Sequence, residues 1–315
     1  MRTWRRFRPT WNQPVPELPD IELYLHALRP RLVGQPLEAV RLASPFLVRS
    51  VEPRPDAAVG RPLLEIRRMG KRIVWKFGDD LFFIIHLMIA GRFQWKPLGT
   101  KIPARLGLAA FDFRDGTLLL TEAGTTRRAS LYVAASDEEV AEHDPGGLDV
   151  LTSSREAFQE RLQIANHTLK RALTDPHLMD GIGNAYSDEI LHAAQLSPLQ
   201  LTSRLTDEQV ARLYDATRQT LVTWRARLIE DTGDAFPAKV TAFHEGMAAH
   251  GRYGKPCPRC GTPIQRIRYA TNEANYCPTC QTGGRLLADR SLSRLMHDDW
   301  PRTLEELERR KSPSS

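Results

Sequence analysis

The four cysteines of the chain form two short pairs, Cys257-Pro-Arg-Cys260 and Cys277-Pro-Thr-Cys280, with sixteen residues between them. Pairs at this spacing are typical of a structural zinc site, in which each tight turn supplies two thiolates to a tetrahedral ion. A disulfide framework is disfavoured, because no secretory signal is recognisable and no cysteine lies elsewhere. Four thiolates leave no open coordination position. One zinc ion should therefore hold a hairpin, and no catalytic metal is expected.

A second stretch whose residues could form a binding site is Asp180-Gly-Ile-Gly-Asn184-Ala-Tyr186, which precedes an apolar helical pattern. A dinucleotide fingerprint would need a preceding strand and a third glycine, and both are missing. What remains is a tight turn that feeds a helix N-terminus, where free backbone N–H groups bind phosphate well. A plain turn between two helices is the alternative, and this stretch alone leaves both open.

The elements that would position these residues fall into two halves. A helical period begins near Asp20 and stops at Gly34, and residues 37 to about 133 then read as short strands. Asp115-Gly116 is a good hairpin turn between two of them. This half should be an antiparallel sandwich opened by one helix. After residues 143–150 the patterns become helical, and in 205–230 the apolar stripe comprises Val210, Leu213, Leu221, Trp224 and Leu228.

We therefore predict an α+β protein. The predicted parts are an N-terminal extension (1–15), a β-sandwich (16–135), a helical domain (150–245), a zinc finger (250–290), and a helix with a tail (291–315).

Composition and charge limit the kinds of partner that the chain could bind. The chain lacks a run of about 18 apolar residues, so no membrane span is expected. The net charge of +6 favours a polyanionic partner. However, four arginines lie in residues 1–15, which hold no acid, so global charge argues only weakly for nucleic acid.

Three separated pieces then converge: Pro16-Glu17-Leu-Pro-Asp20, the Asp180–Leu191 segment, and the paired cysteines followed by Gln281. In this order they resemble the formamidopyrimidine-DNA glycosylase / endonuclease VIII (Fpg/Nei) family of base-excision repair enzymes, over nearly the whole chain. The resemblance implies a β-sandwich, a helix–two-turn–helix domain with a zinc finger, and DNA in the cleft between them.

The resemblance also implies roles for individual residues. Pro16 would be the nucleophile, through an α-amine that forms a Schiff base with the damaged nucleotide, and Glu17 the acid/base. An α-amine has a pKa of about 7.7–8, so a useful fraction is neutral at physiological pH. Lys71 would assist catalysis near the lesion. The residues expected at the DNA are Lys170 and Asn184 on phosphates, Arg127 and Arg128 in a loop that fills the gap, and Ile89 as an apolar wedge.

In mid-chain the nitrogen of Pro16 is an amide and cannot form the iminium. Two explanations stay open. In the first, the codon of Val15 is the true start codon, and residues 1–14 are translated upstream sequence. In the second, the extension is real and either blocks the enzyme or is cleaved before Pro16. The first is favoured, because residues 1–14 are acid-free and lack a structural period.

The chain also departs from the family pattern. Asn272 stands where the zinc hairpin usually carries an arginine, and it offers a hydrogen bond but no charge. Arg266 or Arg268 are candidates to compensate. Arg127-Arg128-Ala129 lacks the aromatic residue of oxidised-purine enzymes. The preferred lesion, the opposite base and the number of eliminations are left open.

The expected function is a monomeric, bifunctional DNA glycosylase / apurinic-apyrimidinic lyase that removes oxidised bases from damaged duplex DNA, in the bacterial cytoplasm with the nucleoid. The alternative is a non-catalytic damage-binding protein with a blocked proline amine. Glu17 and Lys71 argue against it, since a binder has no evident need for that pair beside Pro16.

Overall fold

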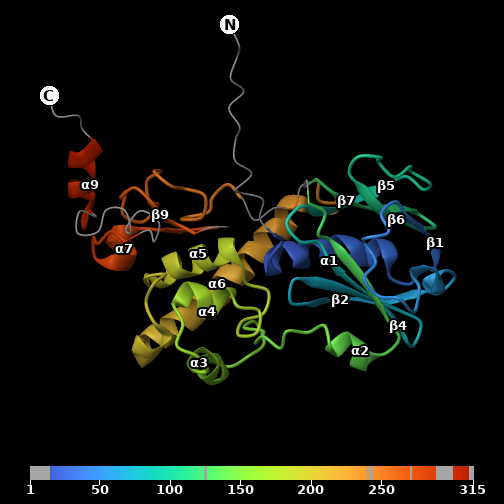
Figure 1. Cartoon of the computed structure of the whole chain (residues 1–315), viewed down its shortest axis with the longest axis horizontal. Helices are drawn as coiled ribbons and strands as arrows, with labels where there is room; N and C mark the ends of the chain where they lie inside the picture. The colour runs from blue at the N-terminus through green and yellow to red at the C-terminus, as the bar shows by residue number, and fades with distance from the viewer. Residues whose placement is uncertain are drawn as a thin grey trace, which may run out of the picture.

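The computed structural model describes residues 15–123, 126–238, 240, 244–269, 272–288 and 301–311. Figure 1 shows a β-rich half and a helical half side by side, with the cysteine-bearing module packed at the far end of the helical half. The predicted α+β class is confirmed. The predicted extension lies, apart from Val15, outside the described residues.

The N-terminal half begins with helix α1 (Leu18–Leu32), which is followed in the chain by a sandwich of two four-stranded antiparallel sheets. One sheet has the order β1-β6-β7-β5 and the other β2-β3-β4-β8. Their bounds are β1 (Leu37–Leu42), β2 (Leu63–Met69), β3 (Arg72–Phe77), β4 (Leu81–His86), β5 (Gly91–Lys96), β6 (Gly107–Phe113), β7 (Gly116–Glu122) and β8 (Ser130–Ala134), with a short 3-10 helix, η1 (Pro55–Ala58). The strand β8 was not predicted.

Aromatic side chains from both sheets form the centre of the sandwich. Trp75 on β3 stacks on Phe93 of β5, with ring centroids 6.2 Å apart, and meets the ring of Phe111 on β6 edge-on at 5.2 Å. All three side chains are fully buried. Contacts of this size across the two sheets contribute more than area burial alone, so they fix how the sheets face each other.

The hairpin between β6 and β7 is where the sequence predicted it, but its turn is one residue earlier. Phe113 pairs with Gly116, so Arg114 and Asp115 are the two turn residues. Gly116 serves a different purpose, because a Cβ there would lie 2.5 Å from the Trp95 ring. Glycine is needed for close packing at this position and not for the turn.

The second half is helical, with α2 (Asp137–Ala141), α3 (Arg155–Gln163), α4 (Leu169–Thr174), α5 (Asn184–Ala194), the 3-10 helix η2 (Thr202–Arg204) and α6 (Asp207–Thr232). The short helix α2 was not predicted. In α6 the predicted apolar stripe is buried. This helix packs against α5 in one half and α1 in the other, so a single long element joins the two halves (Figure 1).

The cysteine-bearing module is a small hairpin followed by a turn of helix. Its elements are β9 (Gln265–Arg268), β10 (Glu273–Tyr276) and α7 (Pro278–Thr282). The last described helix is α9 (Leu304–Lys311). Among the described residues, no helix is both long and apolar enough to cross a bilayer.

Candidate functional site

The carboxylate of Glu17 sits at the N-terminus of α5. It accepts hydrogen bonds from the backbone N–H groups of Gly183 at 2.6 Å, Ala185 at 2.8 Å and Tyr186 at 3.2 Å. These are free donors at a helix start, where a negative charge is also favoured by the helix dipole. The sequence suggested either a phosphate or nothing at this helix end. The anion held there is instead a side chain of the protein itself.

Backbone bonds hold the segment that carries Glu17. Its N–H donates to Oδ2 of Asp20 at 2.9 Å, and the next N–H, that of Leu18, donates to the carbonyl of Gly181 at 2.9 Å. Asp20 is fully buried, and its Oδ1 lies 3.2 Å from Nε2 of His244. The start of α1 is therefore fixed to the Gly181 turn, and Pro16, which is also buried, lies beside that junction.

Lys71 reaches the same point from a hairpin turn. Gly70, with φ 61°, and Lys71 form the two-residue connection between β2 and β3, where a glycine with positive φ is favoured. A Cβ placed on Gly183 would lie 2.6 Å from Oε1 of Glu17 and 2.7 Å from Nζ of Lys71. Both functional groups therefore flank one glycine, and a Cβ at that position would displace them.

Burial moves the pKa values of the two groups toward each other. It raises the pKa of Glu17, against the opposing effects of Lys71 and the backbone donors. It lowers the pKa of Lys71, against the attraction of Glu17. A carboxyl group and an amine whose proton affinities approach each other can exchange protons with a substrate, as general acid/base catalysis requires.

Arg68 is a further residue of this region, which we did not single out from the sequence. Its buried guanidinium meets three carboxylates: Glu22 at 3.2 Å, Asp149 at 2.8 Å, and Asp180. It also donates to the carbonyl of Gly70 at 3.1 Å. Arg68 thus connects the hairpin of Lys71 to the turn before α5. The partners are distant in sequence, so no local pattern could have revealed them.

Lys170 lies inside the helical half. Its ammonium donates to Oδ1 of Asp188 at 2.6 Å and to the carbonyl of Asn184 at 2.6 Å. The other oxygen of Asp188 lies 2.8 Å from Nδ1 of His250. All three ionisable side chains are buried. Lys170 and Asn184 are therefore neighbours, but the charge of Lys170 is largely engaged within the protein.

The residues predicted to fill the gap in the DNA lie on neighbouring loops of the β-rich half. Ile89 is exposed in the turn between β4 and β5, next to Met88, which has a φ of 53°. The N–H of Ala123 donates to the carbonyl of Ala90 at 3.4 Å, which places the start of the next loop beside this turn.

That loop carries Arg127 and Arg128, both exposed. Buried Glu122 anchors its far end by accepting the N–H groups of Arg128 at 2.9 Å and Ala129 at 3.2 Å. Arg127 donates to the carbonyl of Arg105 at 2.9 Å. Glu122 is another residue missed from the sequence.

Asn272 is exposed at the end of the β9–β10 hairpin. It lines a pocket of about 630 Å³ together with Lys170 and the residues around the start of α4. Arg266, one candidate to replace the missing charge, pairs with Glu273 at 3.4 Å and stacks on Tyr253 at 4.1 Å. Arg268 is exposed on the same hairpin.

The four cysteines converge. The sulfur atoms of Cys257, Cys260, Cys277 and Cys280 all lie within 4.8 Å of one another. A tetrahedral zinc ion with Zn–S bonds of about 2.3 Å holds its sulfur ligands roughly 3.8 Å apart, so the cluster fits that ion. Cys257 and Cys277 are buried, and a buried cluster of thiolates without a cation would be costly.

Known proteins match the β-sandwich, the helical half and the cysteine-bearing module. The N-terminal domain of formamidopyrimidine-DNA glycosylase matches residues 15–131, the H2TH domain of that protein matches 147–226, and the zinc finger found in FPG and IleRS matches 254–283. The formamidopyrimidine-DNA glycosylase of Thermus thermophilus is 31% identical over 283 residues, which cover 86% of this chain and all of that protein. The Pelotomaculum thermopropionicum enzyme is 28% identical over 277 residues, which are 85% of this chain and 99% of the relative.

Solved structures agree with the sequence relatives. A complex of Lactococcus lactis FPG (MutM) with DNA that contains an oxidised pyrimidine superposes with a TM-score of 0.75 at 25% identity, covering 85% of this chain and all of the other. A complex of MutM with DNA that contains carbocyclic 8-oxo-G superposes with a TM-score of 0.74 at 24% identity, with the same coverage. The three family models together span most of the chain and the Thermus enzyme is 31% identical over 86% of it, so the chain belongs to the formamidopyrimidine-DNA glycosylase family.

Proposed function

We propose that this protein is a bifunctional DNA glycosylase and AP lyase of base-excision repair, which removes oxidised bases from duplex DNA. The observation that carries the proposal is that Glu17, the residue after Pro16, and Lys71 both lie against Gly183 at the N-terminus of α5. A damage-binding protein without catalysis has no use for two buried groups with converging proton affinities. The family membership supports the same assignment.

The reaction begins at the nitrogen of Pro16 when that nitrogen is a free secondary amine. Its lone pair attacks C1′ of the damaged nucleotide, and the base departs with the electrons of the glycosidic bond. The proton that the nitrogen then loses passes to the departing base, which restores the lone pair on the nitrogen. Glu17 in its acid form donates a proton during opening of the sugar ring, and the nitrogen lone pair then forms the iminium. Removal of a proton from C2′ expels the 3′ phosphate by elimination, which cleaves the strand.

The surrounding residues have supporting roles in this proposal. Lys71 places a proton donor beside Glu17 and the reacting sugar. After the nucleotide is extruded, Ile89 and the loop of Arg127 and Arg128 fill the gap that it leaves among the stacked bases of the DNA. Asn184 and Asn272 line the helical side of the DNA path, and Lys170 supports Asn184 by donating to its carbonyl. Phosphate contacts along this path supply affinity that falls with salt.

The cysteine cluster holds one structural zinc ion in this proposal, and the reaction uses no catalytic metal. When bound, zinc fixes the β9–β10 hairpin by joining the loop before it to the helix turn after it. We further propose that the enzyme acts as a monomer on the nucleoid DNA of a bacterial cell. These last assignments rest on the family and on the chemistry of a duplex DNA substrate.

Borohydride trapping on abasic-site duplex DNA tests the lyase. The chain that begins at Pro16 should form a covalent protein–DNA adduct, and the 315-residue chain, whose Pro16 nitrogen is an amide, should not. Pro16→Gly in the shorter chain should keep some trapping through its amine, and Glu17→Gln should lose base excision. Absence of an adduct from both chains, with damaged DNA still bound, would favour the non-catalytic binding protein.

A further inference from the structure

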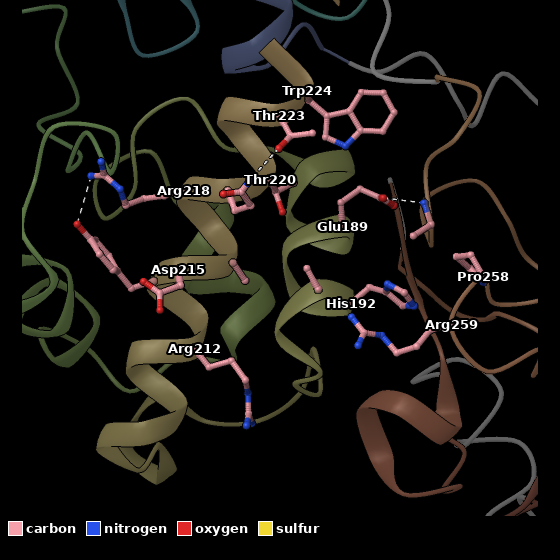
Figure 2. Close-up of a pocket in the computed structure, with 15 residues that line it drawn as sticks. Glu189, His192, Arg212, Asp215, Arg218, Thr220, Thr223, Trp224, Pro258 and Arg259 are labelled. Atoms are coloured by element: carbon pink, nitrogen blue, oxygen red, sulfur yellow. Dashed lines mark hydrogen bonds between the residues drawn. The ribbon is translucent and has the colours of Figure 1, made fainter. Parts of the chain in front are cut away.

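His192 is buried on α5 at the contact between the helical half and the cysteine-bearing module. Its side chain is 5% exposed, and its Nε2 lies 3.1 Å from Sγ of Cys257. Figure 2 shows it projecting from α5 toward the turn that carries Pro258 and Arg259, at the edge of a groove of about 970 Å³. No sequence motif distinguishes this histidine from the others in the chain.

We propose that His192 is a positioning residue of the zinc site, whose Nε2–H donates a hydrogen bond to the zinc-bound thiolate of Cys257. The inference rests on the zinc ion of the proposed function. A zinc-bound thiolate carries no proton, so the hydrogen at a contact of this length has to come from the imidazole. Zinc binding therefore selects the tautomer with its proton on Nε2.

The physical reason for such a donor is the charge of the site. Four thiolates around one Zn²⁺ carry a net charge of −2, and N–H donors to the sulfur atoms offset that charge. Sγ of Cys277 has a backbone donor, the N–H of Cys280 at 3.5 Å. Cys257 is only 2% exposed, so solvent is a poor source of donors for it. His192 supplies the donor there.

The same helix is attached to the module at three further places. Glu189 accepts the N–H groups of Ala248, Ala249 and His250 at 2.7–2.8 Å, and Asp188 contacts the His250 ring. From the module, Gln281 donates to the carbonyl of Leu196, just after α5, at 2.9 Å. Because these contacts persist without His192, its loss should weaken zinc retention and leave the fold in place.

The test compares three variants of the full chain. His192→Phe keeps a ring of similar volume but removes the donor, and His192→Gln keeps an N–H donor. Thr223→Val is the matched control, since Thr223 lines the same groove from α6 (Figure 2). After zinc content is measured by mass spectrometry, zinc transfer to a chelating dye is followed in time. We expect release from His192→Phe to be about 10–100-fold faster, with the other two variants close to the parent protein.

A second readout reports on the hydrogen bond itself. In the parent protein loaded with ¹¹³Cd, the imidazole N–H of His192 should show a scalar coupling to the metal across the N–H···S–Cd path. Coupling would support the proposal even if His192→Phe failed to fold. Unchanged zinc release in His192→Phe together with no coupling would overturn it. A protein that holds neither zinc nor cadmium would overturn the zinc assignment itself, and this inference with it.

Discussion

The N–H of Gly183 lies 2.6 Å from Oε2 of Glu17, although the two residues are 166 positions apart. A helix that begins in the second half of the protein thereby holds the catalytic glutamate proposed for the first. Docking of the two halves completes the site, because Glu17 would otherwise be a buried carboxylate without backbone partners.

Gly183 should therefore be irreplaceable. In Gly183→Ala, the new Cβ would lie 2.6 Å from Glu17 and 2.7 Å from Lys71, so both groups have to move. Displacement on the scale of 1 Å typically lowers catalysis by about 100-fold. Single-turnover base excision by the chain beginning at Pro16 measures this loss. Gly146→Ala is the control, since a Cβ there meets nothing within 4 Å, and the strain of its φ of 74° should affect stability alone. Equal activity of the two variants would contradict our account of the site.

Arg68 should be a major source of stability between the two halves. The substitution Arg68→Gln would leave three carboxylates close together without their cation. They are those of Glu22, Asp149 and Asp180. Removing one partner from a buried pair costs about 3–5 kcal/mol in the free energy of unfolding, and urea denaturation would measure it. Arg61→Gln removes an exposed pair with Asp80 and should cost at most about 1 kcal/mol. A similar small loss for both would show that Arg68 adds little.

His86 should make the fold sensitive to acid. Burial and nearby Arg72 and Lys71 lower its pKa from 6.5 to about 4, and its Nδ1 accepts the N–H of Met88 at 3.0 Å. The folded protein thus binds this proton less readily than the unfolded chain. The stabilisation is complete above pH 6.5 and is lost as the pH falls toward 4, by about 3 kcal/mol in total.

The free energy of unfolding of His86→Asn should therefore depend less on pH across that window, as urea denaturation at a series of pH values would show. His26→Asn, at an exposed position, is the control and should follow the parent protein. Parallel pH profiles for His86→Asn and the parent would disprove the assignment.

The ammonium of Lys170 either neutralises Asp188 or contacts a DNA phosphate, and the two roles lead to different results on mutation. If its ammonium mainly neutralises Asp188, Lys170→Gln should cost about 3–5 kcal/mol in stability and leave the salt dependence of DNA affinity unchanged. If it contacts a phosphate, the slope of log affinity against log salt should fall by about one. The 2.6 Å ion pair leads us to expect the first result. Arg171→Gln, at an exposed neighbour lining the same pocket, calibrates the slope.

Asn272→Arg should strengthen DNA binding. The residue is exposed and lines the same pocket as Lys170, so a guanidinium there adds a cation on the proposed phosphate path. Fluorescence anisotropy with abasic-site duplex should show tighter binding and a salt slope steeper by about one. Asn272→Gln adds no charge and should leave the slope unchanged. An unchanged affinity and salt slope in Asn272→Arg would show that the DNA phosphates do not pass this residue.

The sequence by itself determined the elements and the chemistry of each residue. Local patterns predicted α1, seven of the strands, the helices α3 to α6 and the buried stripe of α6, because periodicity reports which side of an element is buried. The spacing of the cysteines predicted a cluster that the structure assembles. The order of Pro16-Glu17, the Asp180–Leu191 segment and the cysteine pairs indicated the family that the relatives establish.

Tertiary structure decided which groups meet. The local sequence leaves the helix end before Asn184 open to a phosphate or to a plain turn, and it holds Glu17, because docking of the two halves brings a carboxylate there. Arg68 and His192 passed unnoticed for the same reason: their partners lie tens of residues away. Gly116 was assigned to a turn, while its actual constraint is the Trp95 ring across the sheet. Local sequence carries propensity, whereas contacts between distant segments depend on how the packed elements are placed.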